Sequence, residues 1–439
     1  MNDFSFSDYA ATLANTDPIR VNGKVTQVVG LLIEATGPQN PVGDVCHIIT
    51  PSGPLPCEIV GFRRGSVLLM PLIHTEGIRQ GSEVIPTGMP LTAPAGDELL
   101  GRMIDGLGFP IDEKGDLSPD IARVPINREP PNPMTRKRIN APLVTGVKVI
   151  DSLLTIGSGQ RMGIFAGSGV GKSTLMGMIC RSSQADINVI ALVGERGREV
   201  REFVEKDLGE EAMRRSIVVV ATSDQPALVR VKAAFTATAI AEYYRDRDKK
   251  VMLMMDSVTR FALAQREIGL AVGEPPTTRG YTPSVFSLLP KLLERAGTAR
   301  KGSITGIYTV LVEGGDMDEP VADAVRGILD GHLVLSRELA HQNIYPAVDI
   351  LSSISRLMPE ICEKSHFEMA GKLRNIYSTY IKNADAISLG AYKTGSDPKI
   401  DEAIQKEPLI VGLIKQGINE AFTYEKSVNE LKKIVGQGG

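Results

Sequence analysis

The chain has 439 residues, of which 42% are hydrophobic and 23% charged, and its formal net charge is −3 at pH 7. This composition is typical of a folded protein with a sizeable core and one to three domains. A net charge so close to zero provides no general attraction to nucleic acid or to an anionic membrane, and aromatic residues at 5%, with no tryptophan, leave little material for stacking on single strands.

The thiols and imidazoles of the sequence form no recognisable framework. Cys46, Cys57, Cys180 and Cys362 are scattered without CxxC spacing, and the five histidines do not cluster. We therefore expect free buried thiols in a reducing compartment and no structural zinc site. The N-terminus lacks a basic region followed by an apolar core, and no run of 18 or more apolar residues occurs, so we expect a cytoplasmic chain with no signal peptide and no transmembrane helix.

The first 95 residues fall into two parts. Residues 1–20 are mostly polar, and helical spacing places Phe6, Tyr9 and Leu13 on one face, which fits either a frayed terminus or a docking helix for a partner. Residues 21–95 carry short strand-like runs, such as GDVCHIIT and GSVLLMPL, interrupted at close intervals by Gly, Pro, Asn and Asp. This pattern predicts a small antiparallel β-barrel or sandwich with a structural or assembly role.

Residues 96–355 are predicted to form an α/β domain. A Pro-rich connector at 124–146 favours extended backbone draped over a surface between domains. Beyond it, strand-like and helix-like stretches alternate, which predicts a mainly parallel sheet covered on both faces; the strand-like runs are RMGIFA, INVIALV, SIVVVAT, VMLMMD, SITGIYTVLV and GHLVLS.

Residues 356–439 lose the strand-like runs and are predicted to form a small helical domain. Leu431, Ile434 and Val435 recur there at helical spacing.

The stretch AGSGVGKS between RMGIFA and STLMGMICRSS matches the phosphate-loop pattern, with Ala166 in the position that usually holds glycine. Its glycines allow backbone N–H groups to turn inward, and these groups form an anion cradle together with the following helix N-terminus. Lys172 is expected to reach the β- and γ-phosphates of ATP, and the Ser173 hydroxyl to ligate Mg²⁺. The predicted nucleotide-binding residues in this stretch are Ala166, Gly167, Ser168, Gly169, Val170, Gly171, Lys172, Ser173 and Thr174.

Two acids are expected to complete the site. Asp256 ends the apolar run VMLMMD, and a carboxylate at the end of a buried strand can hold Mg²⁺ through water. Glu195 follows another strand and is favoured as the group that orients the attacking water, although Glu199 and Glu202 have the same chemistry. The cation needed for charge that develops in the transition state is left open among Arg279, Arg326 and Arg356, because such an arginine often comes from another subunit.

Longer motifs carry a resemblance to a known family. Together with the phosphate loop, VGERGREV, LMMDSVTRFALAQREIGLAVGEPPTTRGYTPSVFSLLPKLLERAG, GSITGIYTVLVEGGDMDEPVADAVRGILDGHLVLSREL and IYPAVDILSSISR resemble the flagellum-specific export ATPases (flagellar type III secretion ATPases) from about residue 20 to the end. These are relatives of virulence type III secretion ATPases and of the catalytic subunit of rotary ATP synthases. The resemblance implies an N-terminal small β-barrel, a RecA-like P-loop nucleotide domain and a C-terminal helical domain.

The resemblance also implies roles for individual residues. Lys172 would bind phosphate, Ser173 and Asp256 would meet Mg²⁺, and Glu195 would activate water. Arg196 would relay the nucleotide state between subunits, and two further residues would complete the site, Tyr345 packing against adenine and Arg356 reaching into the neighbouring subunit's site. The implied assembly is a homohexamer at the cytoplasmic face of the export apparatus. Its implied partners are a stator-like regulator at the N-terminal segment, a coiled-coil stalk protein in the ring pore, export chaperones with their substrates and the membrane export gate.

Four alternatives to a flagellar export ATPase are weighed at this point. Ser173 after the loop lysine and the absence of an acidic cluster between residues 400 and 439 disfavour a rotary synthase subunit, whereas a virulence export ATPase is close to the flagellar one. A nucleic-acid motor would need a basic, aromatic-bearing N-terminal domain, which residues 20–95 do not provide. A ring component that uses nucleotide only to assemble is not excluded by sequence.

Overall fold

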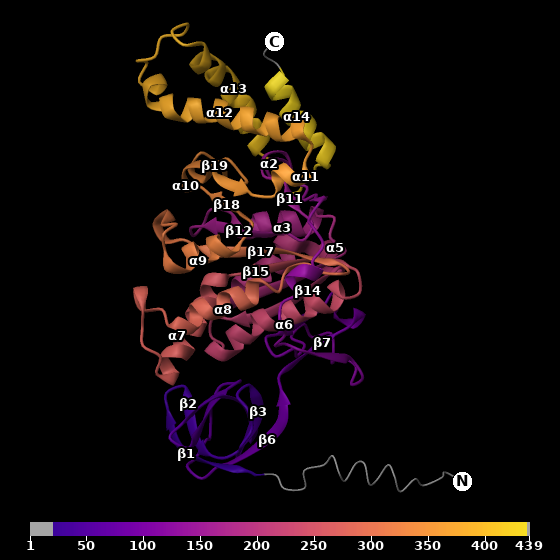
Figure 1. Ribbon diagram of the computed structural model, residues 1–439, viewed down its shortest axis with the longest axis vertical. Helices are drawn as coiled ribbons and strands as arrows, with labels where there is room; N and C mark the ends of the chain where they lie inside the picture. Colours follow the sequence, from indigo (N-terminus) through magenta and orange to yellow (C-terminus); the bar gives the residue numbers. More distant parts are fainter. Residues whose placement is uncertain (1–20, 437–439) are drawn as a thin grey trace, which may run out of the picture. The chain divides into compact units, whose positions relative to one another are not determined.

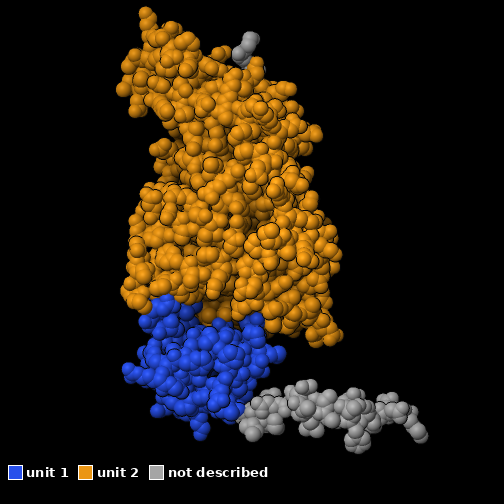
Figure 2. Space-filling view, in the orientation of Figure 1, with its two compact units in different colours: residues 1–91, 268–274 blue, residues 92–267, 275–439 orange. Residues whose placement is uncertain are grey.

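The computed structural model describes residues 21–436. The chain divides into two compact units, the first made of Met1–Leu91 and Ile268–Glu274 and the second of Thr92–Glu267 and Pro275–Gly439, which Figure 2 shows in blue and orange. The docking helix considered for residues 1–20 lies outside the described residues, so it stays a prediction. Each unit is described by itself below.

The first unit is a closed antiparallel barrel, as the strand-like runs predict. The strands follow one another around it in the order β1-β2-β5-β4-β3-β6. Residues on β3 alternate between buried and partly exposed, so that Cys46 and Ile48 point into the barrel core. The strands are β1 (Gly23–Val29), β2 (Leu32–Thr36), β3 (Asp44–Thr50), β4 (Gly53–Arg63), β5 (Ser66–Pro71) and β6 (Glu83–Pro90).

The second unit is built on a nine-stranded sheet in the order β19-β18-β12-β17-β15-β13-β14-β8, with β16 paired to β17. All of these pairs are parallel except β18 with β19 and β16 with β17. Each strand-like run of the sequence forms one of its strands, which confirms the predicted mainly parallel sheet. The strands are β8 (Met103–Asp105), β12 (Arg161–Ala166), β13 (Ile187–Glu195), β14 (Ser216–Thr222), β15 (Lys250–Asp256), β16 (Gly297–Thr298), β17 (Ser303–Leu311), β18 (Gly331–Leu335) and β19 (Val348–Ser355).

Helices cover the sheet, with α3 on one side and α6 and α8 on the other in Figure 1. The alanine-rich α6 packs against β13, β14 and β15. The helices between the connector and the last strand are α2 (Lys148–Leu153), α3 (Lys172–Ser182), α4 (Gly197–Glu202), the π-helix η3 (Phe203–Leu208), α5 (Gly209–Met213), α6 (Ala227–Arg245), α7 (Val258–Val272), α8 (Pro283–Leu293), α9 (Pro320–Ile328) and α10 (Arg337–His341), with short 3₁₀ turns η4 (Thr278–Gly280) and η5 (Glu313–Gly315).

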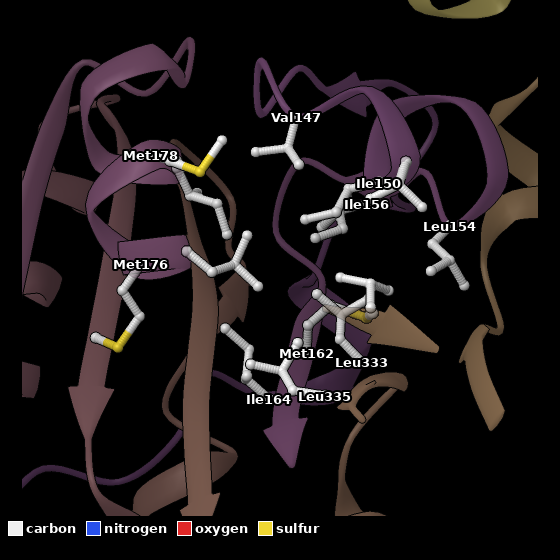
Figure 3. Close-up of a cluster of buried hydrophobic side chains, with 14 of the residues drawn as sticks. Val147, Ile150, Leu154, Ile156, Met162, Ile164, Met176, Met178, Leu333 and Leu335 are labelled. Atoms are coloured by element: carbon white, nitrogen blue, oxygen red, sulfur yellow. The ribbon is translucent and has the colours of Figure 1, made fainter. Parts of the chain in front are cut away.

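A buried apolar cluster fixes α3 on the sheet. Met176 and Met178 of α3 belong to the same cluster as Met162 and Ile164 of β12, and Leu333 and Leu335 of β18 complete it (Figure 3). Each of these side chains is at most 5% exposed. Because α3 and β12 share this core, the loop between them is held at both ends, which positions residues 167–171.

The Pro-rich connector forms no α-helix, as its prolines predict. Arg136 donates hydrogen bonds to the carbonyls of Ala296 and Glu294, so the connector is fastened to the surface of the second unit. The same unit contains both its ends, so the expectation of a segment that runs between domains does not describe its position. The short elements before and within it are β7 (Thr92–Ala95), η1 (Asp97–Leu99), β9 (Ala122–Pro125), η2 (Pro133–Thr135) and β10 (Pro142–Leu143), and β11 (Ile156–Gly157) follows it and pairs with β10.

The C-terminal part is helical, as predicted, and consists of α11 (Met358–Ile361), α12 (Lys364–Ser388), α13 (Pro398–Ile414) and α14 (Tyr424–Gly436). Leu431, Ile434 and Val435 are buried on one face of α14, where it packs against α12 and α2. Within residues 21–436, no helix is both long and apolar enough to cross a membrane.

Candidate active site

The order of the strands brings the predicted site residues together. The strands β12, β17, β15 and β13 are parallel neighbours in the sheet, so their carboxyl ends meet at one edge. The phosphate loop follows β12, Asp256 ends β15 and Glu195 ends β13. This edge is where open α/β sheets bind their ligands.

The phosphate loop has the backbone geometry that its glycines predict. Gly169 and Gly171 have φ angles of 79° and 87°, which side chains other than glycine rarely adopt. A Cβ built on Gly169 would meet nothing within 4 Å, so the loop faces open space, while Val170 is 2% exposed and holds the loop to the core. Ala166 is fully buried at the end of β12, where its methyl group fits the core.

Lys172 begins α3 and forms an ion pair with Asp256 across the site. Its Nζ lies 2.5 Å from Oδ1 of Asp256, which is 3% exposed, and the Thr309 hydroxyl donates a second hydrogen bond of 2.7 Å to the same oxygen. The ammonium group is thereby held over the loop by an internal anion. An incoming phosphate can take the place of this anion as its partner.

Glu195 lies beside the same ammonium group. Its Oε1 is 3.8 Å from Nζ of Lys172 and 3.1 Å from Nε of Arg260, on the first turn of α7. Among the described residues neither Oε1 nor Nε has a hydrogen-bond partner in acceptable geometry, although both atoms are buried. A buried carboxylate oxygen with no donor is a place where a water molecule fits.

The surroundings raise the pKa of Glu195 to about 7. Burial contributes most, the negative charge of Asp256 contributes next, and Lys172 and Arg260 oppose both. The neighbouring Glu199 carboxyl group also raises the pKa of Glu195, and the pKa of Glu199 is lowered in turn. A carboxyl group with a pKa near neutral is suited to accept a proton in catalysis.

The two rival acids occupy less suitable positions. Glu202 lies near Arg198 on the exposed face of α4, at 3.9 Å. Glu199 pairs with Arg196 at 3.2 Å, and the Arg196 side chain is 73% exposed, so this predicted relay residue points to solvent beside the site. Of the three acids, Glu195 is the one that the sheet places next to Lys172.

The residues that follow Lys172 differ in what they face. Ser173 occupies the next position of α3 and is partly exposed at its N-terminal end. Burial raises the pKa of Asp207 on η3, and the nearby Thr174 side chain acts in the opposite sense. Thr174 thus has an internal polar neighbour, and its phosphate contact stays a prediction.

The oxygen donors at this edge fit a magnesium ion that arrives with its nucleotide. The Ser173 hydroxyl and the Asp256 carboxylate are hard oxygen ligands of the kind Mg²⁺ prefers, and the ion usually takes its remaining ligands from water and phosphates. Within the part of the chain that the structure describes, no group of three or more His, Cys, Asp or Glu side chains could hold a metal alone. The donor set thus fits a shared site with substrate phosphates.

Tyr345 lies beside the phosphate loop, although it is far from the loop in sequence. A Cβ built on Gly171 would meet the Cδ1 and Cε1 atoms of the Tyr345 ring at 3.4 Å, and Tyr345 is 38% exposed. A partly exposed aromatic ring in this position offers a face on which a base can stack.

Arg356 lies at the opposite end of the sheet from the phosphate loop, where the parallel strands begin. It follows β19, which runs antiparallel to β18, and Ser355 pairs with Gly331 at the amino end of that strand. The five residues of β18 span roughly 16 Å, so Arg356 cannot reach the phosphate loop of its own chain. It is exposed, and its Nη1 donates to the Leu329 carbonyl at 3.1 Å.

The other two arginines considered as the cation are held by acids. Arg279 pairs with Asp316 at 2.8 Å, and Arg326 pairs with Asp323 at 2.7 Å. An arginine held by a carboxylate is less available to another subunit than the Arg356 guanidinium, whose hydrogen bonds go to backbone carbonyls.

Two residues of the site were missed by sequence reasoning. Arg260 contacts Glu195, and Thr309 hydrogen-bonds Asp256. The signal for Arg260 was its position four residues after Asp256, on the first turn of the following helix. Thr309 carries no local signal, because its role follows from the position of β17 between β12 and β15.

Models of known protein families match most of the chain. The profile described as the ATP synthase alpha/beta family, nucleotide-binding domain, matches residues 146–355. The beta-barrel domain of the same family matches residues 25–88, and the T3SS EscN ATPase C-terminal domain matches residues 362–433.

Individual relatives are similar over nearly their whole length. The flagellum-specific ATP synthase of Bacillus subtilis is 56% identical over 96% of this chain and 97% of its own, and the type 3 secretion system ATPase of Xanthomonas euvesicatoria is 50% identical over 94% and 93%. The structure of the assembled ATPase EscN from enteropathogenic E. coli superposes with a TM-score of 0.90 at 47% identity, over 94% of this chain and 100% of that one. The chain therefore belongs to the family of flagellum-specific and type III secretion ATPases, and it is a nucleotide-binding ATPase.

Proposed function

We propose that this ATPase hydrolyses ATP to support the export of flagellar proteins through a type III secretion apparatus. The observation that carries the proposal is the meeting of Lys172, Asp256 and Glu195 at one sheet edge, in a chain 56% identical to a flagellum-specific ATP synthase. The identity to the type 3 secretion system ATPase of Xanthomonas euvesicatoria is lower, at 50%. Other flagellum-specific relatives are 46–50% identical and overlap with the virulence relatives, so the flagellar role is proposed from the 56% relative and the experiment below separates it from a virulence role.

In the proposed reaction the phosphate loop holds the triphosphate and Glu195 readies the water. Lys172 leaves Asp256 and contacts the β- and γ-phosphates, which the loop N–H groups also bind. Glu195 accepts a hydrogen bond from the attacking water and takes its proton, and Arg260 holds the carboxylate in place. The burial that raises the pKa of Glu195 makes this carboxylate a stronger base than an exposed one.

A bound Mg²⁺ ion would neutralise phosphate charge and orient the terminal phosphate for in-line attack. Ser173 and Asp256 are the residues that would hold it. Release of Asp256 from Lys172 is the step by which this chain makes its carboxylate available, and Thr309 keeps that carboxylate oriented during the exchange.

The active form is a homohexamer in which Arg356 serves the neighbouring subunit. The position of Arg356 at the sheet edge opposite the phosphate loop supports a role in trans, because its own site is out of reach. A guanidinium that contacts the γ-phosphate stabilises the charge of the transition state. Arg196, which is exposed and follows Glu195 in the chain, is proposed to relay the nucleotide state to the neighbouring subunit.

The proposed partners follow the assembly of relatives. EscN has been solved in complex with its central stalk EscO, with a TM-score of 0.87 to this chain, and a comparable coiled-coil stalk is proposed here. A stator-like regulator at residues 1–20, chaperone–substrate complexes at the C-terminal helices and the membrane export gate are further proposed partners. The corresponding location is the cytoplasmic face of the export apparatus.

A complementation experiment tests the flagellar assignment. The gene is deleted in its own organism, and the strain receives the wild-type chain, the Glu195→Gln variant or the Glu202→Gln variant, which changes an exposed acid of the same helix region. We expect loss of swimming and of secreted flagellin, restored by wild type and by Glu202→Gln and not by Glu195→Gln. Normal motility in the deletion strain, with loss of a different set of secreted proteins, would assign the ATPase to virulence export.

A further inference from the structure

A second cluster of reactive groups lies outside the ATPase site, where α2, α12 and α14 meet. Cys362 precedes α12, and its Sγ lies 3.4 Å from the Tyr424 hydroxyl. That hydroxyl is 3.1 Å from Nδ1 of His366, and Nε2 of His366 is 2.7 Å from the Ser152 carbonyl. A thiol, a phenol and an imidazole are thus connected by hydrogen bonds, and no step of ATP hydrolysis uses them.

The hydrogen bonds determine where the protons of this cluster reside. A carbonyl only accepts, so Nε2 of His366 carries a proton and Nδ1 is free to accept one. Tyr424 keeps its proton, because burial and the neighbouring thiol raise its pKa. The thiol proton can therefore pass through the Tyr424 hydroxyl to Nδ1. After this transfer Tyr424 donates a hydrogen bond to the thiolate sulfur, and its oxygen accepts one from Nδ1–H.

The environment of the sulfur favours the thiolate. Burial raises the pKa of Cys362, but the neighbouring polar groups of His366, Thr155 and Tyr424 outweigh burial and lower it overall. The pKa of His366 is raised, because its contacts with the thiol and the Ser152 carbonyl outweigh its own burial. Two acids face the cluster: Glu363 favours the charged form of the imidazole, and Asp151 raises the pKa of Tyr424.

Access distinguishes Cys362 from the other cysteines. Cys46, Cys57 and Cys180 are buried, and burial raises the pKa of each, whereas Cys362 is partly exposed. A cavity of about 340 Å³ opens beside the cluster and is lined by His366 and Tyr424. A small reagent that enters this cavity meets the two partners of the sulfur.

We propose that Cys362 is a modification site at which peroxides oxidise this chain to the sulfenic acid, with His366 and Tyr424 as positioning residues. The thiolate sulfur attacks one oxygen of hydrogen peroxide, an S–O bond forms and the O–O bond breaks. The departing hydroxide takes the proton held by His366 and leaves as water. The sulfur is oxidised by two electrons and the peroxide is reduced by two, so one thiol and one hydrogen peroxide become one sulfenic acid and one water.

The experiment measures thiol reactivity in the full-length protein. Wild type is treated with hydrogen peroxide and dimedone, or with iodoacetamide alone over a range of pH, and the labelled cysteines are located by mass spectrometry. We expect Cys362 to react about tenfold faster at pH 7 than a thiol of ordinary pKa near 8.5, and the three buried cysteines to react far more slowly. A Cys362 rate that follows an ordinary thiol, or that does not exceed the rates of the buried cysteines, overturns the proposal.

Variants test the partners of the sulfur. His366→Asn should lower the Cys362 rate about tenfold at pH 7, while His341→Asn, which changes an exposed histidine, should leave it unchanged. If His366→Asn does not fold, the pH profiles of the Cys362 reaction in wild type and in Tyr424→Phe test the proposal instead. A profile with its midpoint below the ordinary thiol value, moved upward by Tyr424→Phe, supports the proposal, and a midpoint at the ordinary value in both proteins contradicts it.

Discussion

Nε of Arg260 lies 3.1 Å from Oε1 of Glu195, and both atoms are buried without a hydrogen bond in acceptable geometry. The arginine therefore acts on the carboxylate through its charge and leaves the oxygen free to accept from water. Asp256, on the neighbouring strand, acts in the opposite sense and favours the protonated form of Glu195. The protonation state of Glu195 is thus set by burial and by its charged neighbours, which substitutions can change one at a time.

The first prediction concerns the role of Glu195 in turnover. Glu195→Gln removes the group that we propose accepts the proton of the attacking water, so we expect the turnover of ATP to fall about 10²- to 10⁴-fold. Affinity for ATP should stay within about twofold, because Lys172 and the loop N–H groups bind the phosphates. Steady-state hydrolysis and binding of a fluorescent ATP analogue measure the two quantities. Glu202→Gln is the matched control and should behave like wild type, and an active Glu195→Gln enzyme would refute the assigned mechanism.

The second prediction concerns the pH dependence of the same step. The carboxylate must be ionised to act as a base, and the raised pKa of Glu195 places the acid limb of kcat/KM near pH 7. Arg260 lowers this pKa, so Arg260→Gln should move the limb to higher pH. Arg266→Gln, on the same helix, should leave it in place. An acid limb below pH 5 in the wild type, as for an ordinary glutamate, would show that the geometry does not control this proton.

The third prediction concerns stability, and its sign follows from the same pKa. The pKa of Glu195 is about 7 in the folded chain against a model value of 4.5, so the folded state binds this proton more tightly than the unfolded state. The contribution of Glu195 to stability therefore declines as pH rises from 4.5 to 7, and above pH 7 the ionised group destabilises the fold. Glu195→Gln cannot ionise. We expect it to raise Tm at pH 8 by roughly 2–4 °C, the shift that 1 kcal/mol produces in a domain of about 200 residues, and to have a much smaller effect at pH 4.5.

Thermal unfolding of wild type and Glu195→Gln at several pH values between 4.5 and 8 tests this prediction. The contributions of other groups largely cancel in the difference between the two proteins. A difference that shrinks as pH rises would mean that Lys172 and Arg260 outweigh burial and Asp256, and that the carboxylate is stabilised in the fold.

Local sequence was sufficient to predict the strands and the loop. Five consecutive apolar residues before Asp256 identify a buried strand, and the glycines of the phosphate loop require positive φ angles that only a turn of this kind provides. Both features depend on neighbours in the chain. The preference for Glu195 over Glu199 was weaker, because the two differ only in whether they end a strand or lie in the following helix.

The remaining parts of the site depend on the order of the strands, which no local pattern determines. Arg260 and Arg266 look alike in the sequence, and only the position of β13 beside β15 brings Arg260 to Glu195. Likewise, Tyr345 meets Gly171 because β18 lies next to β12. The position of Arg356 at the far edge follows from the antiparallel direction of β19, which the apolar pattern of the run does not reveal.

The fourth prediction concerns Tyr345, whose ring lies beside Gly171. Stacking of a base on an aromatic ring contributes about 1–3 kcal/mol, so Tyr345→Ala should raise the KM for ATP about tenfold with a smaller effect on kcat. Tyr345→Phe keeps the ring and should resemble wild type. Kinetics with both variants separate loss of the ring from loss of the hydroxyl. An unchanged KM in Tyr345→Ala would mean that the adenine binds elsewhere.

The fifth prediction uses the separation of Arg356 from its own phosphate loop. Arg356→Ala and Lys172→Ala should each lose activity by orders of magnitude, since one removes the proposed transition-state cation and the other the proposed phosphate ligand. In a mixed ring, however, the intact loop of an Arg356→Ala subunit can face the intact arginine of a Lys172→Ala subunit. In a random equal mixture, half of the subunits have an intact loop, and half of these face an intact arginine. About a quarter of the boundaries are therefore complete, and about a quarter of the wild-type turnover should return. Mixing Glu195→Gln with Lys172→Ala is the control, because both changes lie on the loop side of the same site and no boundary becomes intact. Rescue in neither mixture would indicate that Arg356 acts within its own subunit. That result would contradict its position, because the antiparallel β19 ends far from the phosphate loop of the same chain.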